Sequence, residues 1–339
     1  MALGELEGFL SGTIAAPEGE RPEEWVELLA PAADAETKRR INSARTAWVA
    51  GLKPASRSSI RDRLVALRKE MAGQGLAGFV VPRADEHQGE YVPKRAERLA
   101  WISNFTGSAG LVIVLQDRAA IFVDGRYTIQ VREQVDASLF EIRHITNEPP
   151  EAWLAQHLKK GEVLGFDPWL VTPDAAQRFR EAARKAGAEL KAVDRNPLDA
   201  AWPDQPAAPI APIWPQDLAH AGASAAEKRA LIAGKLKERG LDAAVISAPD
   251  SLAWLLNVRG GDVPRTPFAL GYAILDKDGK VDLFMDPRKL TAAARTHLGN
   301  EVAVQAPAGF LPALDKLGKA GAAVAVDAMT AGVAVSDRL

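Results

Sequence analysis

The chain has 339 residues, a length that fits two ordinary domains and an appendage. Hydrophobic residues make up 47% and charged residues 25%, as in soluble globular proteins, and the formal net charge of -2 gives no electrostatic reason to expect nucleic acid as a partner. Cysteine is absent, which excludes disulfides, thiolate zinc sites and cysteine nucleophiles.

The N-terminal residues lack the basic start and apolar core of a signal peptide, and no run of 18 apolar residues occurs. We therefore expect a cytoplasmic protein with no membrane partner. Residues 1–55 are predicted to form a short helical extension, because Pro22 and the acidic residues after it are typical of a helix N-terminus. A second run there has the spacing of an amphipathic helix: Ile41, Ala44, Trp48, Val49 and Leu52.

Residues 56–198 are predicted to form a first α/β domain. A helix is expected from Ser58 or Ser59, both good N-cap residues, to Gly73. Short apolar runs predict strands at 77–81, 110–115, 119–124, 140–142, 163–166 and 189–190. The intervening segments predict helices at 127–135, 151–158 and 173–186. This alternation is typical of a mixed sheet flanked by helices.

Residues 199–216 are predicted to be a proline-rich linker. Six prolines crowd the stretch from Asn196 to Pro215. Because proline lacks an N–H and fixes φ, we expect neither a helix nor a central strand there. Trp202 and Trp214 indicate that the linker packs on a surface.

Residues 217–339 are predicted to form a second α/β domain. Helices are expected at 224–238 and 250–256, and a strand at 241–247. A hairpin is expected from 269–275 to 281–285, followed by another helix and a last αβ pair that ends at 324–326.

The two halves share four short matches in the same order, at offsets of 153 to 165 residues. The matched segments are 74–81 with 239–246, 99–104 with 252–257, 122–124 with 284–286, and 165–167 with 325–327. Any two α/β domains share an order of helices and strands, but not the repeated Leu-Ala-Trp of 99–101 and 252–254. We interpret the pattern as a duplicated domain with changes in loop length.

Several motifs do not fit the chemistry that they suggest. The G-x-G-x-x-G of 73–78 follows a helix and precedes a strand, the reverse of a dinucleotide site. Ser108 leads into a strand, unlike the serine of a nucleophile elbow, and the Asp276–Gly279 stretch lacks the closing glutamate of a calcium loop. None of the five histidines has a metal-site spacing.

Taken together, five stretches resemble the three-domain Xaa-Pro aminopeptidases, also called aminopeptidase P, of the M24 metallopeptidase family. They are 85–91 (DEHQGEY), 107–110 (GSAG), 124–127 (DGRY), 202–206 (WPDQP) and 252–260 (LAWLLNVRG), and the resemblance covers residues 57–339. It implies two creatinase-like N-terminal domains, each a mixed sheet flanked by helices. In the family these precede a C-terminal domain that binds two divalent metal ions, with manganese expected, and cleaves the first residue from peptides with proline in second position.

The chain ends at Leu339, where that third domain is expected to begin, and none of its metal ligands can be assigned to a residue here. We therefore expect a non-catalytic N-terminal part that binds no cofactor and does not hydrolyse peptides alone. The resemblance implies short Xaa-Pro peptides as substrates and a homodimer for the intact enzyme. Two alternatives stay open: a stand-alone module that binds peptide or protein, and an unrelated α/β enzyme acting on small molecules.

In such a part, the two domains would limit access to a narrow cleft and contribute to subunit contacts. We expect exposed charged groups in loops to face the cleft. The candidates are Glu86, His87, Tyr91 and Arg126 in the first domain, and Arg259 and Asp262 in the second. The alternative is that these residues form a salt-bridged surface or fix turns. No catalytic residue or metal ligand is assigned.

Overall fold

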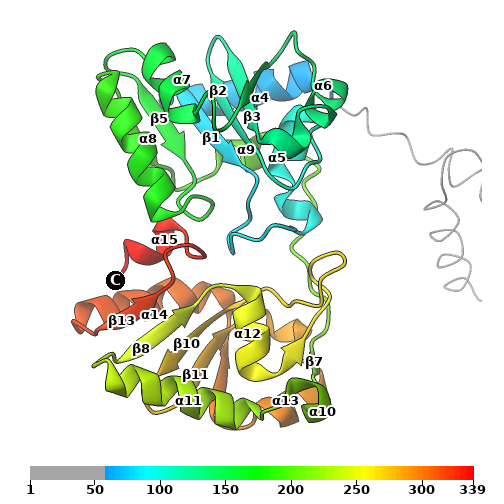
Figure 1. The fold of residues 1–339 in the computed structure, drawn as a ribbon, viewed down its shortest axis with the longest axis vertical. Helices are drawn as coiled ribbons and strands as arrows, with labels where there is room; N and C mark the ends of the chain where they lie inside the picture. Colours follow the sequence, from blue (N-terminus) through cyan, green and yellow to red (C-terminus); the bar gives the residue numbers. More distant parts are fainter. Residues whose placement is uncertain (1–57) are drawn as a thin grey trace, which may run out of the picture. The chain divides into compact units, whose positions relative to one another are not determined.

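The structure, a computed structural model, describes residues 58–339, and the predicted helical extension lies outside them. Within this range two β-sheets follow one another in the chain, each flanked by helices (Figure 1). The predicted α/β class with two mixed sheets is confirmed. None of the helices in residues 58–339 is long and apolar enough to cross a membrane.

The first domain contains a six-stranded sheet, with strands in the order β4-β3-β2-β1-β5-β6. The strands are β1 (Gly78–Pro82), β2 (Leu111–Leu115), β3 (Ala119–Val123), β4 (Glu141–His144), β5 (Val163–Phe166) and β6 (Glu189–Ala192). The helices are α4 (Ile60–Gly73), α5 (Arg98–Ser103), α6 (Gln130–Gln134), α7 (Pro150–His157), α8 (Pro173–Lys185) and α9 (Pro197–Ala201), with short 3₁₀ turns η1 (Lys94–Ala96) and η2 (Gly125–Tyr127). Strand β2 runs antiparallel to β1 and β3, and the other pairs in the sheet are parallel.

Local sequence explains most of these elements. Helix α4 buries the stripe Leu64, Leu67 and Met71 against the sheet, as its spacing predicts. Helix α8 starts at a proline, and the Thr172 hydroxyl accepts a hydrogen bond from the Ala175 amide. Strands β1, β2 and β3 are buried on both faces, which explains their continuous apolar runs.

The second domain contains a five-stranded sheet in the order β12-β11-β10-β8-β13. Its strands are β8 (Ala243–Ile246), β10 (Tyr272–Asp276), β11 (Val281–Phe284), β12 (Val302–Gln305) and β13 (Val324–Val326), and β7 (Trp214–Pro215) pairs separately with β9 (Val258–Arg259). The helices are α10 (Leu218–Ala221), α11 (Ala225–Glu238), α12 (Pro249–Leu256), α13 (Ala292–Leu298), α14 (Phe310–Lys319) and α15 (Val333–Ser336), with 3₁₀ turns η3 (Pro287–Lys289) and η4 (Pro307–Gly309).

The internal repeat is visible in the backbone. The order β12-β11-β10-β8-β13 reproduces β4-β3-β2-β1-β5, and β10, like β2, is the antiparallel strand in the middle. The matched segments also end alike: Asn104 after α5 and Asn257 after α12 are both C-caps in the left-handed region, with φ of 64° and 49°. The Asp124 and Asp286 side chains each accept a hydrogen bond from the amide two residues later.

Three expectations about elements are wrong in detail. The expected helix at 127–135 is shorter, because η2 and α6 divide it. Strand β12 was not expected. Helix α9 lies in the stretch where proline was expected to prevent a helix. It forms because Pro197 occupies the first helical position, where a missing N–H costs nothing, and the Asn196 side chain caps it.

Candidate functional site

The loops that contain the sequence motifs lie at one edge of each sheet, where the parallel strands end. In the first sheet every strand except β2 points the same way, so the loops after β1, β3, β5 and β6 lie at one edge. The equivalent edge of the second sheet, after β8 and at the start of β10, contacts this edge through the hydrogen bonds described below. Figure 1 shows these loops between the two sheets.

The loop after β1, residues 85–91, is shaped by its own aspartate. Asp85 is buried, and its Oδ1 accepts hydrogen bonds from the amides of His87 (3.0 Å) and Gly89 (2.9 Å). These bonds fold the chain into a tight turn that points the His87 ring toward the second domain. The loop is thus a defined structure.

His87 and Glu86 join the two domains. The His87 ring stacks on Tyr272 with centroids 4.5 Å apart, and its Nδ1 lies 2.9 Å from the Ser247 carbonyl oxygen. Because a carbonyl can only accept, Nδ1 carries the hydrogen. The Tyr272 hydroxyl donates to the Glu86 carbonyl (2.9 Å), and burial raises the pKa of Tyr272 well above its ordinary value, which keeps it a donor.

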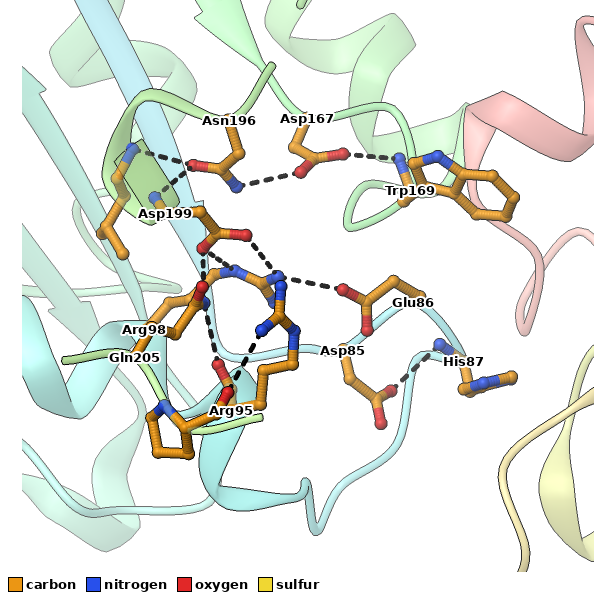
Figure 2. Close-up of polar contacts among 12 residues, drawn as sticks. Asp85, Glu86, His87, Arg95, Arg98, Asp167, Trp169, Asn196, Asp199 and Gln205 are labelled. Atoms are coloured by element: carbon orange, nitrogen blue, oxygen red, sulfur yellow. Dashed lines mark hydrogen bonds and ion pairs between the residues drawn. The ribbon is translucent and has the colours of Figure 1, made fainter. Parts of the chain in front are cut away.

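Arg98 on α5 ties this loop to α9 (Figure 2). Its guanidinium donates through Nε and Nη2 to both oxygens of Asp199 (2.7 and 2.9 Å) and through Nη2 to Glu86 (2.9 Å). Burial lowers the pKa of Arg98, but the bonds to Asp199 and Glu86 outweigh that effect and raise the pKa overall. Arg98 is therefore a permanent cation that is shared between two acids.

The loops after β5 and β6 are connected beside this cluster. Asp167 accepts hydrogen bonds from the Trp169 amide (3.0 Å) and from Asn196 Nδ2 (2.9 Å), as Figure 2 shows. The Asn196 Oδ1 accepts from the Leu198 amide at the start of α9. Burial is the main cause that raises the pKa of Asp167. These bonds hold α9 in the position from which Asp199 reaches Arg98.

A second polar network faces solvent on the outer side of the same edge, and we call it the outer network. It consists of Glu90, Ser108, Arg126 and Tyr127. Ser108 Oγ donates to Glu90 Oε1 (3.1 Å) and lies 2.8 Å from the Tyr127 hydroxyl, which accepts from the Ser108 amide (3.2 Å). The Arg126 guanidinium lies 5.3 Å from the centre of the Tyr127 ring. Three motifs far apart in sequence thus meet at one surface.

Gly107 allows the turn before β2 to lie close to two aromatic rings. A Cβ at Gly107 would collide with the rings of Phe105 and Tyr127, so only glycine lets the turn lie against them. Arg126 itself projects outward: its side chain is 63% exposed, and it pairs with Asp124 at 2.7 Å. Tyr91, at the end of the 85–91 loop, is 53% exposed. Tyr91 and Arg126 are thus available for contact.

The six predicted candidates differ in exposure. Tyr91 and Arg126 are exposed and Glu86 is half-buried, as a contact surface requires. Arg259 is also half-buried. Its guanidinium donates to the carbonyl of Ala253 on α12 and to that of Val258, its neighbour in β9.

The expectation of exposure is wrong for His87 and Asp262, which are both buried. His87 fills the contact between the domains. Asp262 forms an ion pair with Lys289 at 2.6 Å and accepts hydrogen bonds from two amides. Both residues are loop residues by sequence, but long-range partners bury them.

Sequence reasoning missed several members of the site. Ser108 was considered only as a nucleophile, and Arg98, Asp199 and Tyr272 were not singled out. A usable signal existed for Ser108 and Tyr127, since both lie in motifs that contain turn residues and charged neighbours. No local signal pairs Arg98 with Asp199, which lies 101 residues away.

His87 lines two cavities. One of about 320 Å³ is lined by the 85–91 loop together with Pro249, Val263 and Thr330. The other, of about 520 Å³, is lined by Glu86, Arg98, Asp167, Tyr272 and Phe310 among others. One oxygen of Asp85 and one nitrogen of Arg98, both buried, have no hydrogen-bond partner among the described residues.

The acids at this edge do not form a metal site. Within residues 58–339 no group of three or more histidine, aspartate or glutamate side chains is arranged to hold a metal ion. Three acids of this edge already have partners: Glu86 and Asp199 pair with Arg98, and Asp167 accepts from two N–H donors. The described residues therefore do not fit a two-metal centre, and no reaction step is assigned to one.

Comparison with known proteins relates the chain to one family. Residues 63–198 and residues 204–339 each match a family model described as a creatinase/prolidase N-terminal domain. Aminopeptidase P2 of Arabidopsis thaliana is 34% identical over 283 residues, which cover 81% of this chain and 40% of that protein. A probable Xaa-Pro aminopeptidase P of Coccidioides posadasii is 34% identical over 300 residues, 88% of this chain and 46% of that protein.

A solved structure shows the same arrangement. The X-prolyl aminopeptidase of Caenorhabditis elegans, described as a cytosolic enzyme with a di-nuclear active site, superposes with a TM-score of 0.77 at 27% identity. The similarity covers 83% of this chain and 48% of that one. The chain thus spans less than half of each of these three proteins.

Proposed function

Because the chain belongs to the Xaa-Pro aminopeptidase family and carries its two creatinase/prolidase N-terminal domains, we propose that it is the peptide-selecting, non-catalytic part of such an aminopeptidase. In this role the two domains limit access to a cleft and contribute to subunit contacts, while the hydrolytic chemistry belongs to a further domain. The outer network is the observation that carries the proposal, since it places an exposed guanidinium, paired on one side with Asp124, and a phenol at one surface.

The outer network has the chemistry for holding a peptide. Arg126 keeps unused N–H donors beyond those bound to Asp124, and a guanidinium binds a peptide carbonyl or a C-terminal carboxylate well. Tyr91 and Tyr127 offer flat apolar faces with a hydroxyl at the tip. The Glu90–Ser108–Tyr127 bonds hold these groups in place, which lowers the entropy lost when a peptide binds.

The finer assignments follow the family. The substrates are short peptides with proline in second position. Two divalent metal ions, manganese foremost, act in the catalytic domain. The intact enzyme is a cytoplasmic homodimer. The similarity to relatives named Xaa-Pro aminopeptidase P supports the substrate class, and the C. elegans enzyme supports two metals and the cytoplasm.

The first test asks whether the purified 339-residue chain hydrolyses an Xaa-Pro tripeptide with and without added manganese. We expect no release of the first amino acid above the rate of buffer, since the described residues offer no two-metal centre. Manganese-dependent release by the chain alone would refute the non-catalytic role.

The second test asks whether the outer network selects peptides. Residues 58–339 are joined to the remaining part of the C. elegans enzyme, and Arg126→Ala is compared with Arg288→Ala. Arg288 is a matched control, because it has the same ion pair with an aspartate two residues earlier and similar exposure, but lies in the second domain. We expect Arg126→Ala to raise KM for a tripeptide roughly tenfold and Arg288→Ala to leave it unchanged. Equal effects of the two would refute the role of the outer network.

The alternative function, a stand-alone binding module, is tested by calorimetry with the same tripeptide and the chain alone. A module binds with a micromolar Kd, whereas one wall of a cleft binds too weakly to be measured at such concentrations.

A further inference from the structure

The cavity of about 320 Å³ beside the 85–91 loop has walls from both domains. The first domain contributes that loop, and the second contributes the start of α12, the loop after β9, and Thr330. Among the described residues, no lysine or arginine lines it, whereas three acids do: Asp85, Glu90 and Asp250. We call it the acidic cavity. Its volume is within the range of about 300–1,000 Å³ that is usual for small-molecule sites.

Asp85 gives the acidic cavity a buried negative charge. It is 1% exposed, and its Oδ1 holds the loop through the amides of His87 and Gly89, while its Oδ2 has no hydrogen-bond partner within residues 58–339. Burial lowers the pKa of Arg83, and nearby acids that include Asp85 partly offset this. Arg83 nevertheless donates to the Gly107 carbonyl and forms no ion pair with Asp85. A buried carboxylate oxygen without a donor favours a positively charged donor from outside.

The other polar side chains of the wall have already used their hydrogens. Gln88 donates through Nε2 to two backbone carbonyls, which leaves its Oε1 as an acceptor. The Thr266 hydroxyl donates to a carbonyl of its own loop, and the Thr330 hydroxyl donates to a carboxylate. A hydroxyl that has donated its one hydrogen can only accept. The Nδ1–H of His87 is bound to the Ser247 carbonyl. The wall therefore fits a ligand that brings donors and positive charge.

The rest of the wall is apolar. Pro249, Val263, Phe268 and Leu270 line it together with the polar groups. A bare metal ion does not fit, because no group of three or more histidine, aspartate or glutamate side chains within residues 58–339 is arranged to hold one. An ammonium group on a short hydrocarbon chain uses both parts of the wall. Its N–H groups meet the acceptors, and its carbon atoms leave water against the apolar side chains.

We propose that the acidic cavity binds a small free primary alkylamine as its ammonium ion. The ammonium group lies toward Asp85, and the hydrocarbon chain lies against Val263, Phe268 and Leu270. The occupant is a free molecule because walls from two domains enclose a volume that suits one small ligand and leaves no room for a peptide backbone with its side chains. The proposal goes beyond the selection of Xaa-Pro peptides. It rests neither on hydrolysis nor on the outer network, which shares only Glu90 with this cavity.

The test is binding of isopentylamine to the 339-residue chain at neutral pH, measured by ligand-observed NMR titration. Isopentylamine is a cation under these conditions, because the pKa of an alkylamine is close to that of lysine, about 10.4. Isopentyl alcohol is the neutral control with the same hydrocarbon chain. N-acetyl-lysinamide is the second control, because it carries a similar ammonium group on a peptide backbone.

Two substitutions test the assigned position. Asp85→Asn keeps the oxygen that accepts from the loop amides, but it replaces Oδ2 by an NH₂ group, which is a donor and has no negative charge. Asp286→Asn is the matched control, because Asp286 also accepts from a loop amide but does not line the cavity. Thr266→Phe narrows the cavity without changing its charge. Circular dichroism checks that each variant is folded.

We expect isopentylamine to bind with a Kd on the order of 1 mM, and the alcohol and N-acetyl-lysinamide to bind at least tenfold more weakly. Asp85→Asn and Thr266→Phe should each weaken binding of the amine at least tenfold, and Asp286→Asn should leave it unchanged.

Four results would overturn the proposal. They are no binding of the amine at 20 mM, equal binding of the alcohol, unchanged affinity in folded Asp85→Asn, and tighter binding of N-acetyl-lysinamide, which would make a lysine side chain of a peptide the occupant. Should Asp85→Asn not fold, Thr266→Phe decides, and unchanged affinity in that variant overturns the assignment. None of these results bears on Arg126 or on hydrolysis, so the proposed function is tested separately.

Discussion

The buried ion pair of Lys289 and Asp262 allows the most quantitative prediction. Lys289 Nζ lies 2.6 Å from Asp262 Oδ2 and donates to the Leu270 carbonyl, and the side chains are 5% and 0% exposed. Asp262 also accepts hydrogen bonds from the amides of Ala211 and Leu270 (3.1 and 2.7 Å). The carboxylate therefore joins the linker, the loop after β9 and the segment just before β10.

Lys289→Met removes the cation but keeps an apolar chain of similar length. It leaves the Asp262 carboxylate buried with two amide donors and no counter-charge. Breaking a buried pair in this way costs about 3–5 kcal/mol of unfolding free energy. A loss of about 4 kcal/mol reduces the folding equilibrium constant roughly a thousandfold. With a urea m-value of about 2 kcal/mol/M, the unfolding midpoint of the second domain should fall by about 2 M.

The assay is urea unfolding followed by circular dichroism, with hydrogen exchange to locate the change in β10 and β11. Lys277→Met is the matched control, because Lys277 pairs with Asp242 at 2.8 Å but both side chains are largely exposed. This control should leave the midpoint almost unchanged. A shift for Lys289→Met no larger than that for Lys277→Met would refute the reasoning, since it would mean that water solvates Asp262.

Three further predictions concern single side chains. Burial raises the pKa of Asp167, so the folded state binds this proton more tightly than the unfolded chain does. The free energy of unfolding should therefore fall as pH rises from the ordinary pKa of 3.8 through the raised pKa. Asp167→Asn should remove this pH dependence in urea titrations between pH 3.5 and 7. Trp202→Ala should cost about 3–5 kcal/mol in urea unfolding, because it empties a packed site against Trp101, whereas Trp254→Ala should cost much less; equal costs would contradict the difference in burial. Asn104→Ala should cost about 1 kcal/mol, because alanine tolerates a φ of 64° poorly, and Asn104→Gly should recover most of it in the same measurement.

Most of the scaffold was predictable because its signals are local. The apolar runs at 77–81 and 163–166 predict strands by composition, and the stripe at Leu64, Leu67 and Met71 predicts a helix by spacing. The repeat was predictable because four short segments recur in the same order, including the Leu-Ala-Trp of 99–101 and 252–254. Strand β12 was missed because its residues alternate only weakly and its burial comes from pairing with β11.

The candidate site was only partly predictable, because its energetics depend on distant partners. His87 looked like a solvated loop residue, but Ser247 and Tyr272 bury it from the second domain. Asp262 looked like an exposed loop acid until Lys289 was found beside it. Helix α9 was missed because counting prolines ignores position: the same residue that breaks a helix in its interior begins one at its first turn.

The contact between His87 and the second domain has a consequence for how these domains can be inherited. The 85–91 loop takes its shape partly from the Ser247 carbonyl and the Tyr272 hydroxyl, which belong to the other copy. A crossover that brought in a second domain with no tyrosine at position 272 would remove the hydroxyl bound to the Glu86 carbonyl and the ring stacked on His87, and so would disturb a loop in the unexchanged half. The duplicated domains are therefore expected to recombine as a pair, although each has its own sheet and its own core.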